Sequence, residues 1–433
     1  MSMTTRVLLG LALGAVIGLA LAFHDPDTAA AVAGIVQPIG RLWLNALQMT
    51  VVPLVAALIV LGVNTASDAA SSGRTARRAI VVFLVLLTLA AVYTALAAPA
   101  LLSLLPRDAS LVDSFRAALS PVEAGTAPGG FGDAIAAIIP ANVVAAAAAS
   151  AMLPLVVFAL FFGFALNRID PAHKSRLLDF VQAVADVMIV IVRWVLWAAP
   201  VGVFALVLAV CAQVGVKVLG ALGWYIALQC TLYISVTLML YLVARVFGGE
   251  PFRRFALAIL PAQTIAASTQ SSLASLPAML ESARVRLGYP LQVSSLVLPM
   301  AVSLFRITSP VQYLGVAAFV AWIYGIDVTA AHMAAGVGLA VIVSMGSVGL
   351  PGQVSFMATN MPIVQTMGLP VEPLGVLLAV DTIPDVFSTV GNVSADLTAT
   401  SIVARGADTP AAEPEQPGTA EATALDTGDA GPA

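Results

Sequence analysis

The sequence predicts an all-α integral membrane protein whose helices cross a lipid bilayer many times. Of its 433 residues, 60% are hydrophobic and 10% are charged, and the mean hydropathy is +1.00. A typical soluble domain carries about 25% charged residues. Apolar runs long enough to span a bilayer as helices recur along the whole chain. An outer-membrane β-barrel would instead show alternating segments of about ten residues.

The long apolar runs predict eight transmembrane helices. Six are expected in the first part of the chain, at 6–23, 37–63, 78–105, 139–166, 178–212 and 218–246, and two more at 291–323 and 372–404. Two interrupted segments, at 256–282 and 334–366, place small and hydroxyl residues between apolar arms too short to cross a membrane. We expect each to be a re-entrant helical hairpin, because non-helical backbone at membrane depth is tolerated only where protein or a cavity surrounds it.

The distribution of Lys and Arg predicts that both termini lie in the cytoplasm. With these spans, thirteen basic residues fall in loops on one side and three, Arg107, Arg116 and Lys217, on the other. Basic loops face the cytoplasm in most membrane proteins. The chain then divides into residues 1–247, a core at 248–405, and an acidic tail at 406–433. The tail has too little apolar surface to fold, and we expect it to be a disordered, solvated cytoplasmic segment.

The last apolar segment carries polar side chains at helical spacing. Asp381, Asp385, Ser388, Asn392 and Asp396 follow one another at i, i+4, i+7, i+11 and i+15, so they share one stripe of a helix. A carboxylate at the bilayer centre costs at least about 2.5 kcal/mol, so this stripe must face protein, water or ions. It predicts part of a solute or cation site; the alternative is a polar seam with internally paired acids.

The two interrupted segments have tips that suit a binding site. Residues 270–277 read Gln-Ser-Ser-Leu-Ala-Ser-Leu-Pro, and residues 347–352 read Ser-Val-Gly-Leu-Pro-Gly. A helix that begins at such a tip points its positive dipole end at it, which favours an anionic solute. Paired interruptions in two parts of a chain indicate the binding site of a transporter. The alternative is two kinks at helix contacts.

Together these motifs resemble the glutamate-transporter fold of the dicarboxylate/amino acid:cation symporters. The resemblance covers residues 6–405 and rests on the serine-rich hairpin, the Pro-Gly hairpin tip and the acidic last span. It implies inverted repeats, a homotrimer, and an elevator-type movement of a transport domain against a fixed scaffold. It also implies a substrate site lined by both hairpin tips and the last two spans. The expected substrate-binding residues are Ser271, Ser272, Arg306, Thr308, Gly349, Pro351, Asp385, Ser388 and Asn392.

The family's seventh span normally unwinds at an Asn-Met-Asp-Gly-Thr motif that holds sodium, and this chain departs from it. Residues 305–309 read Phe-Arg-Ile-Thr-Ser, so Ile307 replaces the aspartate and Arg306 the methionine. We therefore expect fewer bound sodium ions. Arg306 could replace a sodium ion, clamp a substrate carboxylate, or pair with Asp385 or Asp396. The family's arginine for acidic side chains is here Ser388, while Asp385 is retained as the expected partner of an amino group.

The sequence therefore predicts a secondary active symporter in the inner membrane of a bacterium, and not an enzyme. Its solute is expected to be a small carboxylate, with small neutral or acidic amino acids ahead of amine-free C4-dicarboxylates. The coupling ion is Na⁺ or H⁺: Asn392 and Asp396 are expected to hold sodium, and Asp381 a proton or cation. No other cofactor and no nucleic-acid partner is expected. A non-transporting sensor or an ion-conducting member of the same fold is the alternative.

Overall fold

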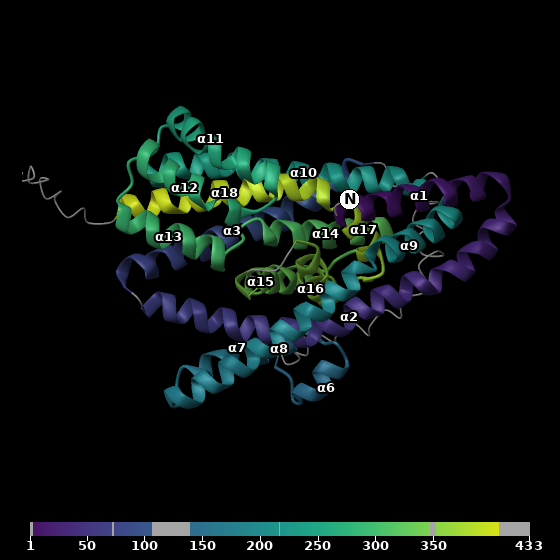
Figure 1. Cartoon of the computed structure of the whole chain (residues 1–433), viewed down its shortest axis with the longest axis horizontal. Coiled ribbons are helices and arrows are strands. Elements are labelled where there is room, and N and C mark those ends of the chain that lie inside the picture. Colours follow the sequence, from purple (N-terminus) through teal and green to yellow (C-terminus); the bar gives the residue numbers. More distant parts are fainter. Residues whose placement is uncertain (1–2, 72, 106–138, 216, 347–351, 407–433) are drawn as a thin grey trace, which may run out of the picture.

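The computed structural model describes residues 3–71, 73–105, 139–215, 217–346 and 352–406, and every regular element in these ranges is a helix. Most of the long helices run along the long axis of the molecule (Figure 1). The predicted all-helical class is therefore confirmed. Of the predicted acidic tail, only Gly406 lies within the described residues.

The first part of the chain forms eight described helices. They are α1 (Met3–His24), α2 (Pro26–Ser71), α3 (Arg74–Ser103), α6 (Val143–Ala148), α7 (Met152–Leu166), α8 (Pro171–Trp197), α9 (Ala199–Val214) and α10 (Lys217–Val243). The helix predicted at 37–63 is far too short, because α2 already begins directly after Asp25. The Asp25 carboxylate accepts hydrogen bonds from the Thr28 hydroxyl and the Asp27 amide, which start the helix and hold the pKa of Asp25 below its usual value.

The second part of the chain repeats one order of elements twice. The helix pair α11 (Phe252–Thr269) and α12 (Ser272–Glu281) precedes the broken helix α13 (Leu291–Leu304) and α14 (Ser309–Tyr324). The pair α15 (Ala330–Gly346) and α16 (Gly352–Thr366) precedes the broken helix α17 (Pro373–Val380) and α18 (Thr382–Arg405). A helical hairpin followed by an interrupted span in each half is the pattern expected for a repeat.

Four predicted continuous helices are each two helices, and a proline follows every break. The breaks lie within the helices expected at 139–166, 178–212, 291–323 and 372–404. At the last of these breaks the chain bends by 69° at Asp381. A proline lacks the amide that would bond the carbonyl four residues earlier, and its ring clashes with that carbonyl. Each proline lies within the first three residues of the second helix: Pro154, Pro200, Pro310 and Pro384.

Glycines of α1 bring that helix into close contact with α9. Gly10, Gly14 and Gly18 recur at four-residue spacing on one face of α1. A Cβ on Gly14 would lie 2.7 Å from the carbonyl oxygen of Phe204, and one on Gly18 would lie 2.7 Å from that of Leu208. Small residues at this spacing let the backbones of membrane helices approach closely. The stripe was not identified from the sequence, although its spacing is visible there.

The helix α18 lies at the centre of the second part. It packs against α10, α11, α13 and α3, and its beginning lies near α14 and α17 in the middle of the molecule (Figure 1). The polar residues of α18 therefore face other helices and are shielded from lipid. This placement explains how a helix with three acids can belong to an otherwise apolar protein.

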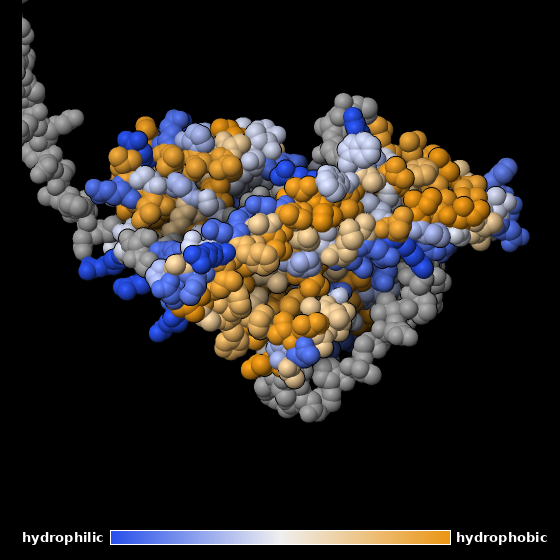
Figure 2. Space-filling view, turned by 60° about the horizontal axis from the view of Figure 1, so that its bottom comes forward, coloured by the Kyte–Doolittle hydropathy of each residue, from blue (hydrophilic) through white to orange (hydrophobic). Residues whose placement is uncertain are grey.

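The surface of the molecule suits a lipid environment. Among the described residues, six helical segments are long and apolar enough to cross a membrane, or seven if α17 and α18 count as one span. Large apolar side chains are exposed on several helices, including Leu13 of α1, Trp194 of α8 and Leu238 of α10. Figure 2 shows hydrophobic residues over much of one face, with hydrophilic residues at its left and right ends. These features support a multi-pass membrane protein; the count of eight spans stays a prediction.

Candidate functional site

The break between α13 and α14 is fastened to α18 by Thr308. Its amide donates a hydrogen bond of 3.0 Å to Oδ1 of Asn392, and its hydroxyl lies 2.8 Å from that of Ser388. Thr308 and Ser388 are buried and satisfy each other. The Nδ2 amide of Asn392 donates no hydrogen bond within the described residues, so it is available to a ligand. Roles for Thr308 and Ser388 as direct solute ligands stay predictions.

Arg306, in the same break, carries a cation with no direct partner. Its half-buried guanidinium forms no ion pair or hydrogen bond within the described part of the chain, but its charge acts on both Asp381 and Asp385. A pairing with Asp396 is not formed, and a direct ion pair with Asp385 is not formed either, so the predicted salt bridge is wrong for this conformation. A half-buried charge without a partner at this depth indicates a ligand or an ion as its counterpart.

Asp385 supplies a carboxylate close to this cation. It is half-buried on the first turn of α18, and its side chain accepts no hydrogen bond from any described residue. The Arg306 charge acts on this carboxylate although no ion pair joins them, so both belong to the candidate site. This pair matches a solute that has both an anionic and a cationic group, because each fixed charge would gain a partner only when the solute binds.

Asp381 lies at the 69° bend between α17 and α18 and is already engaged by protein. Its Oδ1 accepts a 2.9 Å hydrogen bond from the Tyr225 hydroxyl of α10, and its Oδ2 accepts a 2.8 Å bond from Nε2 of Gln312 of α14. Tyr225 and Gln312 are not among the residues predicted from the sequence. A lone tyrosine or glutamine in an apolar run gives no signal until the partner acid is placed beside it.

Asp396 lies away from the other two acids. It is 1% exposed, and its Oδ1 has no hydrogen-bond partner among the described residues. It follows Asp385 by eleven residues, which is about 16 Å along a helix. Asp385 and Asp396 therefore lie on one helix, α18, but about three turns apart along it. A buried carboxylate oxygen without a donor suits a bound cation, which is the expected role of Asp396 with Asn392.

The positions of Phe305 and Ile307 are closed by apolar packing. The ring of Phe305 stacks on Phe83 of α3 with centroids 4.6 Å apart, and Ile307 is 1% exposed in the hydrophobic core. A cation needs oxygen ligands, which these side chains lack. The side chains of Phe305 and Ile307 do not fit a sodium ion; the expectation of fewer sodium sites stays a prediction. Within the described residues no cluster of three His, Cys, Asp or Glu could hold a metal.

The tip of the first hairpin reaches the beginning of α18. Gln270, with a left-handed φ of 51°, ends α11, and its Nε2 donates a 3.2 Å hydrogen bond to the Thr382 carbonyl. Ser271 caps α12 by accepting a 3.2 Å bond from the Ala274 amide, and Ser272 follows it, partly buried. The amino ends of α12, α14 and α18 are therefore tied to one region, which favours an anion there. Gly349 and Pro351 of the second hairpin lie outside the described residues.

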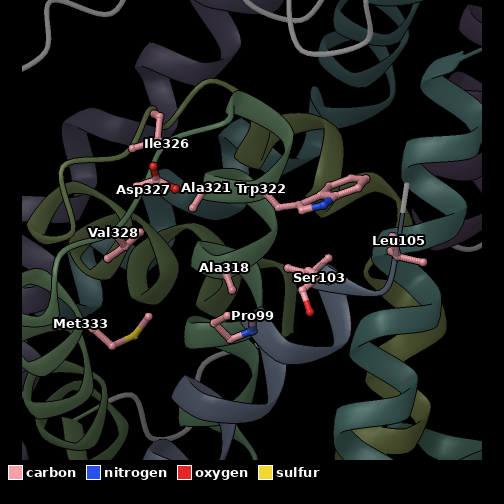
Figure 3. A pocket seen from close by; sticks show the side chains of 11 residues that line it. Pro99, Ser103, Leu105, Ala318, Ala321, Trp322, Ile326, Asp327, Val328 and Met333 are labelled. Carbon is pink, nitrogen blue, oxygen red and sulfur yellow. The ribbon is translucent and has the colours of Figure 1, made fainter. Parts of the chain in front are cut away.

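A large cavity lies elsewhere. It has a volume of about 640 Å³ and is lined by the ends of α3 and α14 and the beginning of α15, including Pro99, Trp322, Asp327 and Met333 (Figure 3). Its lining is mainly apolar, and Asp327 is the only charged residue among the described residues that line it. None of the predicted site residues contributes to it. The chemistry of the polar groups on α13, α14 and α18 therefore locates the candidate site better than cavity size does.

Comparison with known proteins identifies the family of the chain. The model of the sodium:dicarboxylate symporter family matches residues 3–406. The chain is 29% identical to the proton/glutamate-aspartate symporter of Escherichia coli, over 93% of this chain and 92% of that protein. It is also 29% identical to the proton/sodium-glutamate symport protein of Bacillus caldotenax, over 92% and 93%. The C4-dicarboxylate transport protein 2 of Polaromonas naphthalenivorans is 27% identical, over 90% and 85%.

Proposed function

The chain belongs to the sodium:dicarboxylate symporter family, and from this premise we propose that it is a cation-coupled symporter of a small carboxylate solute. The proposal of a transporter agrees with the names of its relatives, which are symporters and transport proteins and not enzymes. The alternative of a sensor or channel has no support among them. The bacterial inner membrane, cytoplasmic termini and a homotrimer belong to the same proposal.

The observation that carries this function is the free Arg306 guanidinium beside the free Asp385 carboxylate. We assign a solute carboxylate to Arg306 and a solute amino group to Asp385. A second carboxylate would meet the Asn392 amide and the hairpin tip at Ser271 and Ser272. Only an acidic amino acid fills all three positions. A neutral amino acid leaves one of them empty, and an amine-free diacid leaves Asp385 without a cation next to a second anion.

The movement is proposed to follow the two packing groups of the fold. The glycine contacts of α1 join it to α9, and α9 packs in turn against α2. The α18 helix and its neighbours α10, α11 and α13 carry the site residues. A rigid group that carries a site past another rigid group is the requirement of an elevator mechanism, and this division supports it.

The cation would be held at Asp396. When bound, it would neutralise the buried carboxylate of Asp396, with oxygens near Asn392 as further ligands. A second site at Phe305 and Ile307 is not supported, because those side chains are apolar. Neutralising a buried acid lowers the cost of bringing an anionic solute into the same group of helices. This shared electrostatic term is the proposed basis of coupling.

Uptake into proteoliposomes tests the function. Radiolabelled aspartate, alanine and succinate are supplied under a sodium gradient and, separately, under a proton gradient. We expect aspartate to accumulate, alanine to compete weakly and succinate to compete least. Arg193→Met, at an exposed arginine of α8, is the control for Arg306→Met. Solute-dependent stabilisation without accumulation under either gradient would support the sensor. Competition by succinate alone would overturn the assignment of Asp385.

A further inference from the structure

A buried acceptor next to the Asp381 hydrogen bonds has no donor. Oε1 of Gln229 is buried and unpartnered within the described residues, while its Nε2 donates a 3.1 Å hydrogen bond to the Gln312 carbonyl. Gln229 follows Tyr225 by one helical turn of α10, and its side chain acts on the Tyr225 hydroxyl. An unsatisfied buried oxygen costs about 1–3 kcal/mol and needs an explanation.

The packing holds the Gln229 amide in this position. A Cβ on Gly315 of α14 would lie 2.6 Å from Oε1 of Gln229 and 3.1 Å from its amide carbon. Only glycine at 315 leaves room for the amide between α10 and α14. The empty acceptor is therefore held one helical turn of α10 from Tyr225, whose hydroxyl donates to Asp381.

Tyr225 thus has two acceptors and one proton to donate. In the structure its hydroxyl donates to Oδ1 of Asp381, the arrangement that stabilises an ionised carboxylate. If Asp381 takes up a proton, its own hydroxyl can donate to the Tyr225 oxygen, and Tyr225 can turn to donate to Gln229. Both arrangements satisfy the Asp381–Tyr225 contact, and the second also satisfies Oε1 of Gln229.

We propose that Asp381, Tyr225 and Gln229 form a proton-binding relay and that Asp381 carries the proton that moves with the solute. This inference rests on the proposed function and names its coupling site. One proton binds the Asp381 carboxylate to give the neutral acid; Tyr225 keeps its own proton and changes acceptor. The only bond formed is the O–H bond of the Asp381 carboxyl group, and it breaks again when the proton is released.

The surroundings of Asp381 favour a proton over a metal ion. Its two hydrogen-bond partners, Tyr225 and Gln312, present O–H and N–H donors to the carboxylate, and not the oxygen ligands that a metal ion needs. The ionisable groups that face it are Tyr225, Cys230 and Tyr233 of α10, Asp385 of α18 and Arg306 of the break. Gln312, from α14, is uncharged.

The charges explain why the proton and the solute would move together. Asp381 and Asp385 carry two negative charges against the single positive charge of Arg306, a net charge of −1. An acidic amino acid adds a further −1 to this group. A proton on Asp381 removes one negative charge one helical turn from Asp385, so proton and anionic solute each favour binding of the other.

The first test measures protons directly. Purified protein in weakly buffered detergent solution receives aspartate, and a pH indicator reports proton uptake. We expect about one proton per bound solute in the wild type and none in Asp381→Asn, whose solute affinity no longer changes with pH. Proton uptake that persists in Asp381→Asn, with solute still bound, overturns the relay. Failure of the wild type to bind any solute would instead refute the proposed function.

A pair of variants tests the relay if Asp381→Asn does not fold. Tyr225→Phe removes a donor to the charged carboxylate, so the pH of half-maximal proton uptake should rise. Gln229→Leu removes the acceptor used by the protonated state, so the pH of half-maximal proton uptake should fall. Each shift should be about one pH unit, or tenfold in proton affinity. Equal shifts, or none, overturn the relay.

Tyr93→Phe is the matched control for these variants. The Tyr93 hydroxyl of α3 donates a 2.7 Å hydrogen bond to Ser235 of α10 and has no contact with Asp381. Its loss removes a comparable bond between helices, but the pH of half-maximal uptake should not move. A shift in Tyr93→Phe as large as that in Tyr225→Phe would mean that general loosening of α10, and not the relay, sets the pH dependence.

Discussion

Replacing Arg306 by methionine separates its possible roles most sharply. The guanidinium has no ion pair or hydrogen bond in the described residues, so its removal breaks no contact within the protein that the structure shows. Loss of the guanidinium should therefore weaken solute binding and leave the fold unchanged. Methionine keeps an unbranched side chain of similar bulk, which limits the disturbance of the break between α13 and α14.

The expected size follows from the bonds that a guanidinium makes. A hydrogen bond to a charged group contributes about 1.5–3 kcal/mol, and an arginine can pair with a carboxylate through two of them. A total of about 3 kcal/mol corresponds to roughly 100-fold weaker binding. Arg306→Lys keeps the charge without the planar fork and should lose about tenfold.

The measurement compares two solutes as well as two proteins. Affinities for aspartate and asparagine are obtained from solute-dependent thermal stabilisation of wild type and Arg306→Met. Asparagine lacks the side-chain carboxylate, so the wild type should bind it more weakly, and the substitution should weaken it far less than aspartate. If Arg306→Met weakens both solutes equally, Arg306 does not hold that carboxylate. Stronger binding of sodium by the variant would support the view that Arg306 replaces an ion.

Three further substitutions test the other parts of the structure. Gly14→Leu should separate α1 from α9 and cost at least about 1–3 kcal/mol of stability in thermal unfolding, whereas Gly34→Leu, which meets no atom within 4 Å, should not. Asp396→Asn should abolish stabilisation by sodium, which is about 1.4 kcal/mol at ten times the dissociation constant; stabilisation that remains would place the ion elsewhere. Arg78→Gln removes the 3.1 Å bond to the Ile402 carbonyl at the end of α18 and should cost about 1 kcal/mol, with the exposed Arg77→Gln as its control.

The sequence was most informative where polar residues interrupt apolar runs. Three acids in the last span would be too costly to expose to lipid, so the span was expected to face protein. In the structure the charge of Arg306 acts on two of them, Asp381 and Asp385. The serine tip was expected to be a break, and Gln270 and Ser271 form one beside α18. The energetic cost of polar groups in a membrane makes such positions readable without any tertiary information.

The breaks in the apolar helices could not be read in the same way. Pro200 and Pro384 each follow a break, but Pro53 and Pro261 lie inside α2 and α11, which continue through them. A proline always removes one backbone hydrogen bond, but neighbouring helices decide whether the helix kinks or ends. The position of the proline can be read from the sequence, but whether the helix ends there depends on the packing of its neighbours.

Proline placement and the polar site are nevertheless connected. Pro384 lacks the amide that would bond the Val380 carbonyl, so α17 ends there and the chain bends at Asp381. The bend turns the Asp381 side chain toward α10 and α14, where Tyr225 and Gln312 bind it. In a continuous helix Asp381 would lie on the stripe with Asp385 and Asp396, as the spacing alone suggested. The bend gives Asp381 different surroundings from Asp385, and about three turns of α18 separate Asp385 from Asp396. The proposed separate roles in binding solute, proton and cation depend on these differences.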